Sequence, residues 1–376
     1  MKRQLAKKIV SELAQSAGVT LNGNQPWDIQ IHNEQFYDSI LHGNTLALGE
    51  AYMNKWWDCA SLDNLFEKLI HAGLEQKIKK DPRLLFKIAF AKLINLQTKN
   101  RAFEVGEKHY DLSNLLFQKM LDSRMNYTCA YWNTATTLEE AQLAKLELVC
   151  KKIQLQPGMR VLDIGCGWGA FAKYAAEKYG VNVVGVTISK QQIALAQQLC
   201  EGLPIEIRLQ DYRDLNHTHE KFDRIVSLGM FEHVGHLNYH TYMQTAHHIL
   251  NDHGLFLLHT IGSNHTTVRT DEWISKYIFP NGMLPSIAQI GKASEPFFFM
   301  EDWHNFGVDY DRTLMSWHHN FNANWDTLKP YFDERFYRMW NYYLLTCAGG
   351  FRAHAMQLWQ IVFSKNGTQG RYTAPR

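Results

Sequence analysis

Apolar and polar positions alternate in blocks between residues 160 and 260. Short runs rich in Val, Ile and Leu recur, with longer stretches of helical periodicity between them. Continuous apolar runs are typical of parallel strands that are buried on both faces. The segment 181–188 is such a run, and we predict five strands in all, over residues 161–164, 181–188, 205–209, 224–228 and 255–259. Strands that alternate with helical segments indicate a doubly wound α/β sheet.

The intervening segments carry helix signals. Ala170–Tyr179 is helical in pattern, and Ser189 is a suitable N-cap for a helix from Lys190 to about Cys200. We also expect helices over about 110–153, before the first strand, and further helices followed by a strand over 358–363 at the end of the chain.

The first strand leads into the most informative motif, residues 161–169. Gly165, Gly167 and Gly169 alternate at a sharp turn from strand to helix, where a ligand can lie against bare backbone. Asp163 would repel a phosphate, whereas it suits a cationic or amino-bearing ligand. The combination predicts the S-adenosylmethionine loop of a Rossmann-like methyltransferase. Three alternating glycines alone are a weak indication of a methyltransferase, so the prediction also depends on the neighbouring strands.

Polar side chains at the ends of the strands support this prediction, because ligands collect at the carboxyl edge of such sheets. These residues are Asp163, Thr187, Asp211, Glu232 and His259. Each residue alone also has a structural explanation without a ligand. Asp163 could be a turn residue, Asp211 a solvated acid in a loop, and Tyr212 an aromatic residue packed in the core. Thr187 stands where many proteins of this fold have a ribose-binding acid, so we expect ribose recognition from Thr187 and Gln192.

Length and composition set the domain organisation. The chain has 376 residues, 45% of them hydrophobic and 20% charged, which is typical of a folded protein with two domains. We predict a mostly helical N-terminal domain over 1–100 and a catalytic domain over 101–376. An aromatic-rich insertion at about 263–308 is long for a connection. It is expected to form a lid or wall of an apolar channel, with a buried accessory subdomain as the alternative.

The charge distribution indicates a membrane surface as a partner. The net charge is only +2, yet segment 76–101 holds eight basic residues and one acid. Within it, 84–96 has helical periodicity and a wide apolar face, which fits an anionic bilayer. The alternative is a helix packed on its own domain with a solvated basic face. Residues 1–17 repeat the pattern on a smaller scale. Few aromatics accompany the basic residues, which argues against nucleic acid.

Other features concern the compartment. The six cysteines lack C-x-x-C pairs and read as reduced thiols. The eighteen histidines show no metal-site spacing, so we expect no metal. We find no signal peptide and no run that approaches the roughly 20 apolar residues of a membrane span. We therefore expect a cytoplasmic protein that associates peripherally and reversibly with membranes.

Six motifs together resemble the cyclopropane fatty acid synthases, over about residues 100 to 365. They are residues 127–132 (YTCAYW), 161–169, 185–189, 230–235 (MFEHVG), 259–262 (HTIG) and 301–307. The N-terminal helical domain is similar to that of the phospholipid-acting bacterial type. The resemblance implies methylene transfer from S-adenosylmethionine to the cis double bond of an unsaturated acyl chain in a membrane phospholipid. The product is a cyclopropane ring.

The resemblance also implies which residues carry the reaction. An enzyme-bound bicarbonate removes a proton in this family, and its expected ligands are Cys129, Glu232, His259, the Ile261 backbone N–H and Tyr310. The expected cofactor-binding residues are Tyr127, Thr128, Asp163, Gly165, Gly167, Thr187, Gln192, Asp211 and Tyr212. Tyr127 and Thr128 come from the resemblance alone. Aromatic faces can stabilise a carbocation without trapping it, and Trp303, Phe306, Tyr310 and Trp317 are candidates.

Two other functions stay open from the sequence. A conventional lipid or small-molecule methyltransferase would stop after methyl transfer. A membrane-bound regulatory module would retain the fold without turnover, although the intact glycines argue against this reading. A homodimer is a possible assembly. The sequence does not indicate the preferred head group or double-bond position.

Overall fold

The computed structural model describes residues 2–42, 45–74, 113–268, 270–368 and 370–376. Segment 76–101, its apolar part 84–96 and the predicted domain boundary near residue 100 therefore lie outside the described residues. Contacts divide the chain into two compact units. The helical unit comprises 1–113, 271–280 and 321–355, and the sheet unit comprises 114–270, 281–320 and 356–376. The two units thus interleave along the chain, whereas the sequence suggested two consecutive domains.

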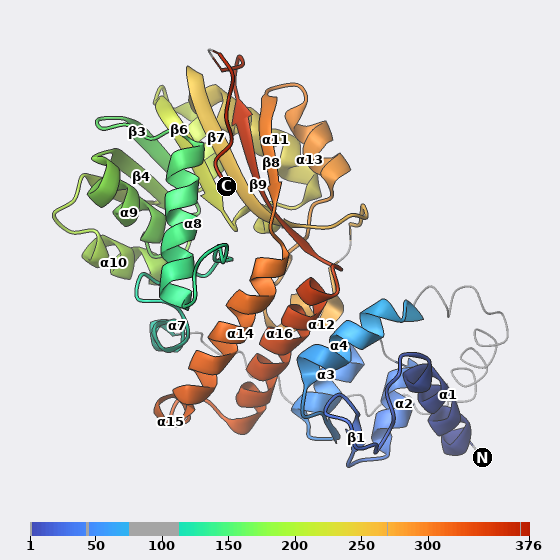
Figure 1. Cartoon of the computed structure of the whole chain (residues 1–376). Helices are drawn as coiled ribbons and strands as arrows, with labels where there is room; N and C mark the ends of the chain where they lie inside the picture. The colour runs from blue at the N-terminus through green and yellow to red at the C-terminus, as the bar shows by residue number, and fades with distance from the viewer. Residues whose placement is uncertain (1, 43–44, 75–112, 269, 369) are drawn as a thin grey trace. The chain divides into compact units, whose positions relative to one another are not determined.

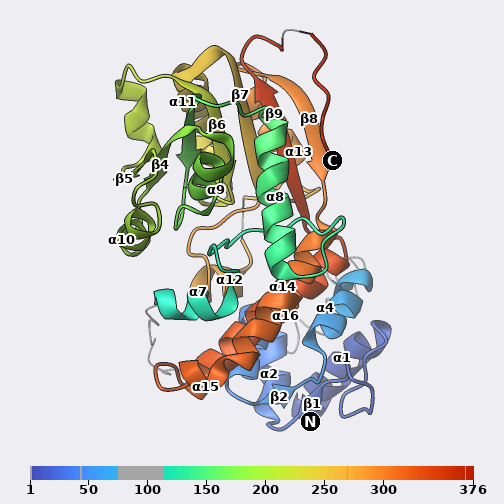
Figure 2. The same ribbon diagram turned by 60° about the vertical axis from the view of Figure 1, so that its left-hand side comes forward.

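The sheet unit contains a seven-stranded sheet of order β5-β4-β3-β6-β7-β9-β8 (Figures 1 and 2). Its strands are β3 (Arg160–Ile164), β4 (Asn182–Thr187), β5 (Ile205–Leu209), β6 (Phe222–Leu228), β7 (Leu250–Gly262), β8 (Phe299–Asn305) and β9 (Gln357–Ser364). All are mutually parallel except β9, which pairs antiparallel with both β7 and β8. The five predicted strands and the closing strand are confirmed, and so is the Rossmann-like α/β class.

Strand β8 was not predicted, because the sequence placed its residues in the insertion at 263–308. It forms the edge of the sheet beside β9 (Figure 2). An edge strand need not be apolar on both faces, and Phe299 and Met300 at its start are exposed. The insertion therefore supplies one strand of the main sheet in addition to connecting segments.

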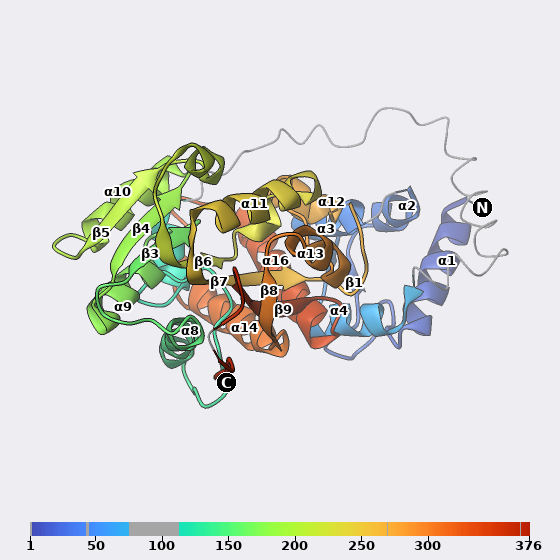
Figure 3. The same cartoon turned by 90° about the horizontal axis from the view of Figure 1, so that it is seen from above.

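Helices cover both faces of this sheet. One face is covered by α8 (Leu138–Lys152) and α9 (Ala170–Tyr179), and the other by α11 (Tyr239–Ile249) and α13 (Ile287–Ser294) (Figure 3). Residues of β7 alternate between the two cores, as a central strand requires: Leu255 and Leu257 face one, Phe256 and Leu258 the other. Helix α10 (Lys190–Leu199) packs against β5, and Ser189 caps it as predicted.

The helices before the first strand differ from the prediction. Helix α7 (Asn114–Met120) and helix α8 are separated by a non-helical segment, 121–137. Thr137 is the N-cap of α8 and forms a capping box. Its side chain accepts a hydrogen bond from the Glu140 N–H, and the Glu140 side chain accepts one from the Thr137 N–H. The helical prediction over 110–153 was therefore wrong for 121–137, a segment of turns, bends and irregular backbone.

The helical unit is built from α1 (Lys2–Ser16), α2 (Gln35–His42), α3 (Thr45–Met53), α4 (Leu62–His71), α12 (Glu272–Tyr277), α15 (Trp325–Leu328) and α16 (Glu334–Arg352), with a short pair of strands, β1 (Gln30–Ile31) and β2 (Trp57–Asp58). Helix α14 (Val308–Ala323) belongs mainly to the sheet unit and ends in this one. Trp57 is fully buried against Tyr52 and Tyr342.

Helix α1 carries an apolar stripe of Leu5, Ile9, Val10 and Leu13, of which Leu5 and Leu13 are half-buried. Ile9 and Val10 are buried within the unit, and α1 packs against α2. The centre of this stripe is therefore covered by protein, as in the alternative of a helix packed on its own domain. Among the described residues, no helix combines the length and the apolar character needed to cross a bilayer.

Candidate active site

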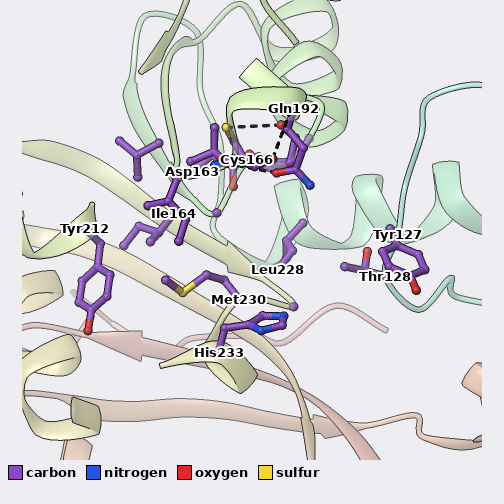
Figure 4. A pocket seen from close by; sticks show the side chains of 18 of the residues that line it. Tyr127, Thr128, Asp163, Ile164, Cys166, Gln192, Tyr212, Leu228, Met230 and His233 are labelled. Atoms are coloured by element: carbon purple, nitrogen blue, oxygen red, sulfur yellow. Dashed lines mark hydrogen bonds between the residues drawn. The ribbon is translucent and has the colours of Figure 1, made fainter. Parts of the chain in front are cut away.

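A cavity of about 440 Å³ lies at the carboxyl edge of the sheet, within the sheet unit. The structure brings all nine predicted cofactor residues to its wall. They are Tyr127, Thr128, Asp163, Gly165, Gly167, Thr187, Gln192, Asp211 and Tyr212. Figure 4 shows Tyr127 and Tyr212 at opposite ends of the cavity, with Met230 and His233 between them.

The glycine loop turns sharply between β3 and α9. Gly165 and Gly167 both have positive φ angles, 81° and 55°, which side-chain-bearing residues rarely adopt. A Cβ on Gly165 would lie 2.6 Å from the Met230 Cγ, whereas a Cβ on Gly167 would meet no atom within 4 Å. At Gly167 the backbone therefore faces open space, which suits the close approach of a ligand.

Asp163 at the end of β3 is buried, and burial raises the pKa of its carboxyl to about 7. The positive charge of Lys145 opposes that rise. Lys145 on α8 is itself fully buried and lines the cavity. Burial lowers the pKa of Lys145 to about 8, while the carboxylates of Asp122 and Asp163 act in the opposite direction. Sequence analysis missed this lysine.

Thr187 and Gln192 meet as the sequence suggested. The Thr187 hydroxyl lies 3.1 Å from Gln192 Oε1 and accepts a hydrogen bond from the Ser189 N–H at 3.2 Å. The Ser189 side chain in turn accepts from the Gln192 N–H at 3.3 Å. These bonds present two neutral polar groups to the cavity at the end of β4.

Asp211 does not stand as an isolated acid. Its two carboxylate oxygens accept from the Arg213 guanidinium at 2.9 and 2.7 Å, and this pairing lowers the pKa of Asp211. Its side chain also caps the short helix that begins at Tyr212. Tyr212 is mostly buried, with its ring 4.9 Å from that of Tyr242.

The segment with Tyr127, Thr128 and Cys129 is held in place by α14. The Ala130 N–H donates to the Thr313 hydroxyl at 3.1 Å, and the Trp132 N–H donates to Asp309 at 2.7 Å. The Trp132 indole N–H also donates to Thr313, at 2.9 Å. These bonds join residues more than 170 positions apart in the sequence.

The five predicted catalytic residues lie in the same unit but do not line the cavity. Glu232 follows β6, and its Oε1 accepts from the Ile261 backbone N–H at 2.7 Å. Its Oε2 is buried without a hydrogen-bond partner among the described residues. Burial raises the pKa of Glu232 to about 7, against the stabilising bond from Ile261.

His259, near the end of β7, is also fully enclosed. Its Nδ1 lies 3.3 Å from Gln360 Nε2, and its Nε2 has no hydrogen-bond partner within the described part of the chain. Burial holds the pKa of His259 well below its usual value, and the charges of Lys145 and Lys152 add to this effect. The imidazole is therefore neutral near pH 7.

Cys129 and Tyr310 complete the predicted set. Burial keeps the pKa of the Cys129 thiol well above its usual value, and its Sγ lies 3.2 Å from the Ala130 carbonyl oxygen. The Tyr310 ring lies 6.0 Å from Trp317, whose ring lies 5.2 Å from the cavity residue Tyr127.

The aromatic candidates are divided in space. Phe306 has its ring 5.9 Å from His259 and 5.2 Å from Tyr131. Trp303 packs instead against Trp359, at 5.0 Å. Phe306 therefore lies beside the predicted catalytic residues, whereas Trp303 belongs to the packing of β8 on β9.

Several cavity residues escaped the sequence analysis, among them Lys145, Trp168, Met230 and His233. Trp168 lies inside the glycine motif and Met230 and His233 inside the MFEHVG motif, so their positions within motifs were the available signal. Lys145 had no such signal, because a lysine on an amphipathic helix normally indicates a solvated face.

The sheet order, the glycine loop and the cavity at the carboxyl edge together define an S-adenosylmethionine-dependent methyltransferase fold. The sequence profile of the mycolic acid cyclopropane synthetase family matches residues 97–361. The chain belongs to this family.

Relatives extend the comparison. The chain is 54% identical over 363 residues to a cyclopropane-fatty-acyl-phospholipid synthase of Escherichia coli, covering 96% of this chain and 94% of the relative. It is 37% identical to a probable fatty acid methyltransferase of Pseudomonas putida, over 71% of this chain and 70% of that protein. A crystal structure of the mycolic acid cyclopropane synthase CmaA1 complexed with SAH and CTAB superposes with a TM-score of 0.63 and 37% identity. It covers 68% of this chain and 96% of that one.

Proposed function

We propose that this enzyme transfers a methylene group from S-adenosylmethionine to the cis double bond of an unsaturated acyl chain in a membrane phospholipid, forming a cyclopropane ring. The observation that carries the proposal is the 54% identity with the E. coli phospholipid synthase over 96% of this chain. The match with the mycolic acid enzyme CmaA1 covers only 68%. A phospholipid acyl chain is therefore the preferred acceptor.

The residues of the cavity suit the cofactor. Asp163 offers a carboxylate to an amino group, Thr187 and Gln192 offer neutral hydrogen-bonding groups, and Gly167 allows close approach to the backbone. The cofactor supplies an electrophilic methyl group when bound. The chain holds this group in line with the double bond, because an alkene is a weak nucleophile and reacts only when well positioned.

Attack by the double bond leaves a carbocation in the acyl chain. The Phe306 ring contacts the predicted catalytic residue His259, and the Trp317 ring contacts both Tyr310 and the cavity residue Tyr127. Aromatic faces of this kind stabilise a cation. Cys129 does not compete for the cation, because burial keeps its thiol protonated.

Ring closure requires a base to remove one proton from the transferred methyl group. The expected bicarbonate supplies that base when bound. Two buried polar atoms without partners among the described residues, Glu232 Oε2 and His259 Nε2, fit a small polar ligand. A neutral His259 can donate or accept according to its tautomer, and Glu232 can accept from a hydroxyl group.

We further propose reversible, peripheral binding to anionic membranes from the cytoplasmic side. Support comes from the charge of segment 76–101 and the apolar pattern of 84–96 in the sequence. The proposal leaves the oligomeric state open between a monomer and a homodimer.

The test is mass spectrometry of lipids from vesicles that carry an unsaturated phospholipid, after incubation with S-adenosylmethionine labelled with deuterium in its methyl group. A cyclopropane product retains two of the three deuterium atoms, because one hydrogen leaves as the ring closes. Retention of all three indicates a methyl branch and favours the second candidate, a lipid methyltransferase, which the P. putida relative suggests. Unlabelled lipid would contradict both proposals.

A further inference from the structure

Lys145 joins the cofactor cavity to the segment that carries the predicted catalytic cysteine. Its ammonium donates to Asn126 Oδ1 at 3.0 Å and to the Thr128 hydroxyl at 2.8 Å. Gln142, which precedes it by three residues on α8, donates to the Thr128 carbonyl oxygen at 2.9 Å. One face of α8 thus fixes both the side chain and the backbone of Thr128.

The other side of Asn126 is fixed by Asp122. The Asn126 N–H and its side-chain amide donate to the two Asp122 carboxylate oxygens, each at 2.8 Å. A buried chain of hydrogen bonds therefore runs from Asp122 through Asn126 and Lys145 to Thr128. Without the ammonium, Asn126 Oδ1 would lose its buried donor, and an unsatisfied buried acceptor is costly.

The charge of Lys145 also acts on the floor of the cavity. The carboxyls of Asp122 and Asp163 interact electrostatically with Lys145, and so does the imidazole of His259, whose protonation Lys145 opposes. Asp163 is buried, so its carboxyl tends towards the neutral form, and Lys145 is the charged group that opposes this tendency. A neutral Asp163 could not attract the amino group of the cofactor.

We propose that Lys145 is a positioning residue for the cofactor, which holds the Asn126–Thr128 wall of the cavity in place and whose positive charge favours a carboxylate at Asp163. This inference rests on the proposed use of S-adenosylmethionine. The ammonium of Lys145 and the sulfonium of the cofactor are both positive and repel each other. The negative charge of the Asp163 carboxylate offsets this repulsion.

The test is the affinity of the full chain for S-adenosylmethionine and S-adenosylhomocysteine, measured by calorimetry between pH 6 and 9. Lys145→Met should weaken both ligands about tenfold or more near neutral pH, since a hydrogen-bonded buried charge is lost. Because Asp163 is then protonated up to a higher pH, the acid limb of the affinity profile should move to higher pH. The loss should therefore shrink as the pH rises.

Two matched variants separate the two roles. Thr128→Val removes one anchor but keeps the charge, so affinity should fall while the acid limb stays at the wild-type pH. Lys152→Met removes another fully buried lysine seven residues further along α8, whose ammonium lies 3.0 Å from Asp302 and which does not line the cavity. It should leave both ligand affinities unchanged. Thermal unfolding followed by circular dichroism confirms that each variant is folded.

Three results would overturn the proposal. One is wild-type affinity of a folded Lys145→Met variant across the pH range. Another is tighter binding of S-adenosylmethionine, which would show that Lys145 mainly repels the sulfonium. The third is an acid limb that does not move, which would make Lys145 a structural anchor alone. Failure of the proposed use of S-adenosylmethionine is distinguishable, because the wild type would then bind neither ligand.

Discussion

The Glu232 carboxyl and the Ile261 backbone N–H form a 2.7 Å hydrogen bond between residues 29 positions apart. The bond links the turn after β6 to the end of β7. It holds one oxygen of a buried carboxyl, and the other oxygen has no partner among the described residues. Such a group is poised for a polar ligand, and its protonation is sensitive to pH near neutrality.

Glu232→Gln should reduce turnover about 10²-fold or more, the usual contribution of general-base catalysis. The amide oxygen can still accept from Ile261, but an amide N–H₂ replaces the second oxygen, which could accept from bicarbonate. Cofactor affinity should stay unchanged, because Glu232 does not line the cavity. Steady-state kinetics with and without added bicarbonate check this, and partial recovery by bicarbonate is expected. Wild-type turnover of the variant after bicarbonate removal would contradict the assignment.

The same variant should change the pH dependence of stability. Burial raises the pKa of Glu232 from its usual value to about 7, so the stability that the protonated form provides is complete at low pH. It is lost as the pH rises towards and through 7. Relative to the wild type, Glu232→Gln should gain up to roughly 3 kcal/mol in unfolding free energy between pH 4.5 and 8. Denaturant unfolding at several pH values measures the gain, and parallel curves would exclude a titrating Glu232.

Gly167→Val should abolish most of the cofactor affinity. The valine would place a branched side chain in the open space of the cavity, at a φ of 55° that valine strongly disfavours. Gly202→Val is a matched control, since Gly202 also has a positive φ and open surroundings but lies outside the cavity. It should be strained to a similar degree and still bind the cofactor. Equal affinity of the two variants in calorimetric titration would place the ligand elsewhere.

Replacing Lys77, Lys79, Lys80 and Arg83 with Gln should weaken binding to anionic vesicles by a few kcal/mol at most, at roughly 1 kcal/mol for each basic residue. Salt should reduce the difference, because exposed charges are screened within about 10 Å at 0.1 M. Neutral vesicles should show a much smaller effect, and cofactor affinity without lipid should not change. Co-sedimentation at low and high salt checks this. Sedimentation like the wild type at low salt would move the docking surface to another segment.

The sheet and the cofactor cavity were largely predictable from local patterns. Central parallel strands are buried on both faces, so β4 appears as a continuous apolar run whose end is visible in the sequence, whereas the edge strand β5 alternates apolar and charged residues. Their carboxyl ends must share one edge of the sheet. For this reason Asp163, Thr187 and Asp211, although more than 20 residues apart, could be assigned to one site.

Tertiary contacts decided the rest. Within the non-helical segment 121–137, the backbone N–H groups of Ala130 and Trp132 bond to Thr313 and Asp309 of a distant helix, and no local pattern in the sequence records these partners. The edge strand β8 exists because β9 offers it hydrogen-bonding partners. Lys145 is buried because Asn126 and Thr128 meet its ammonium, whereas a lysine in a helix would otherwise remain in water. The local pattern of apolar residues shows which face of a helix or strand is buried. Only the folded chain determines which distant groups form hydrogen bonds with a buried polar side chain.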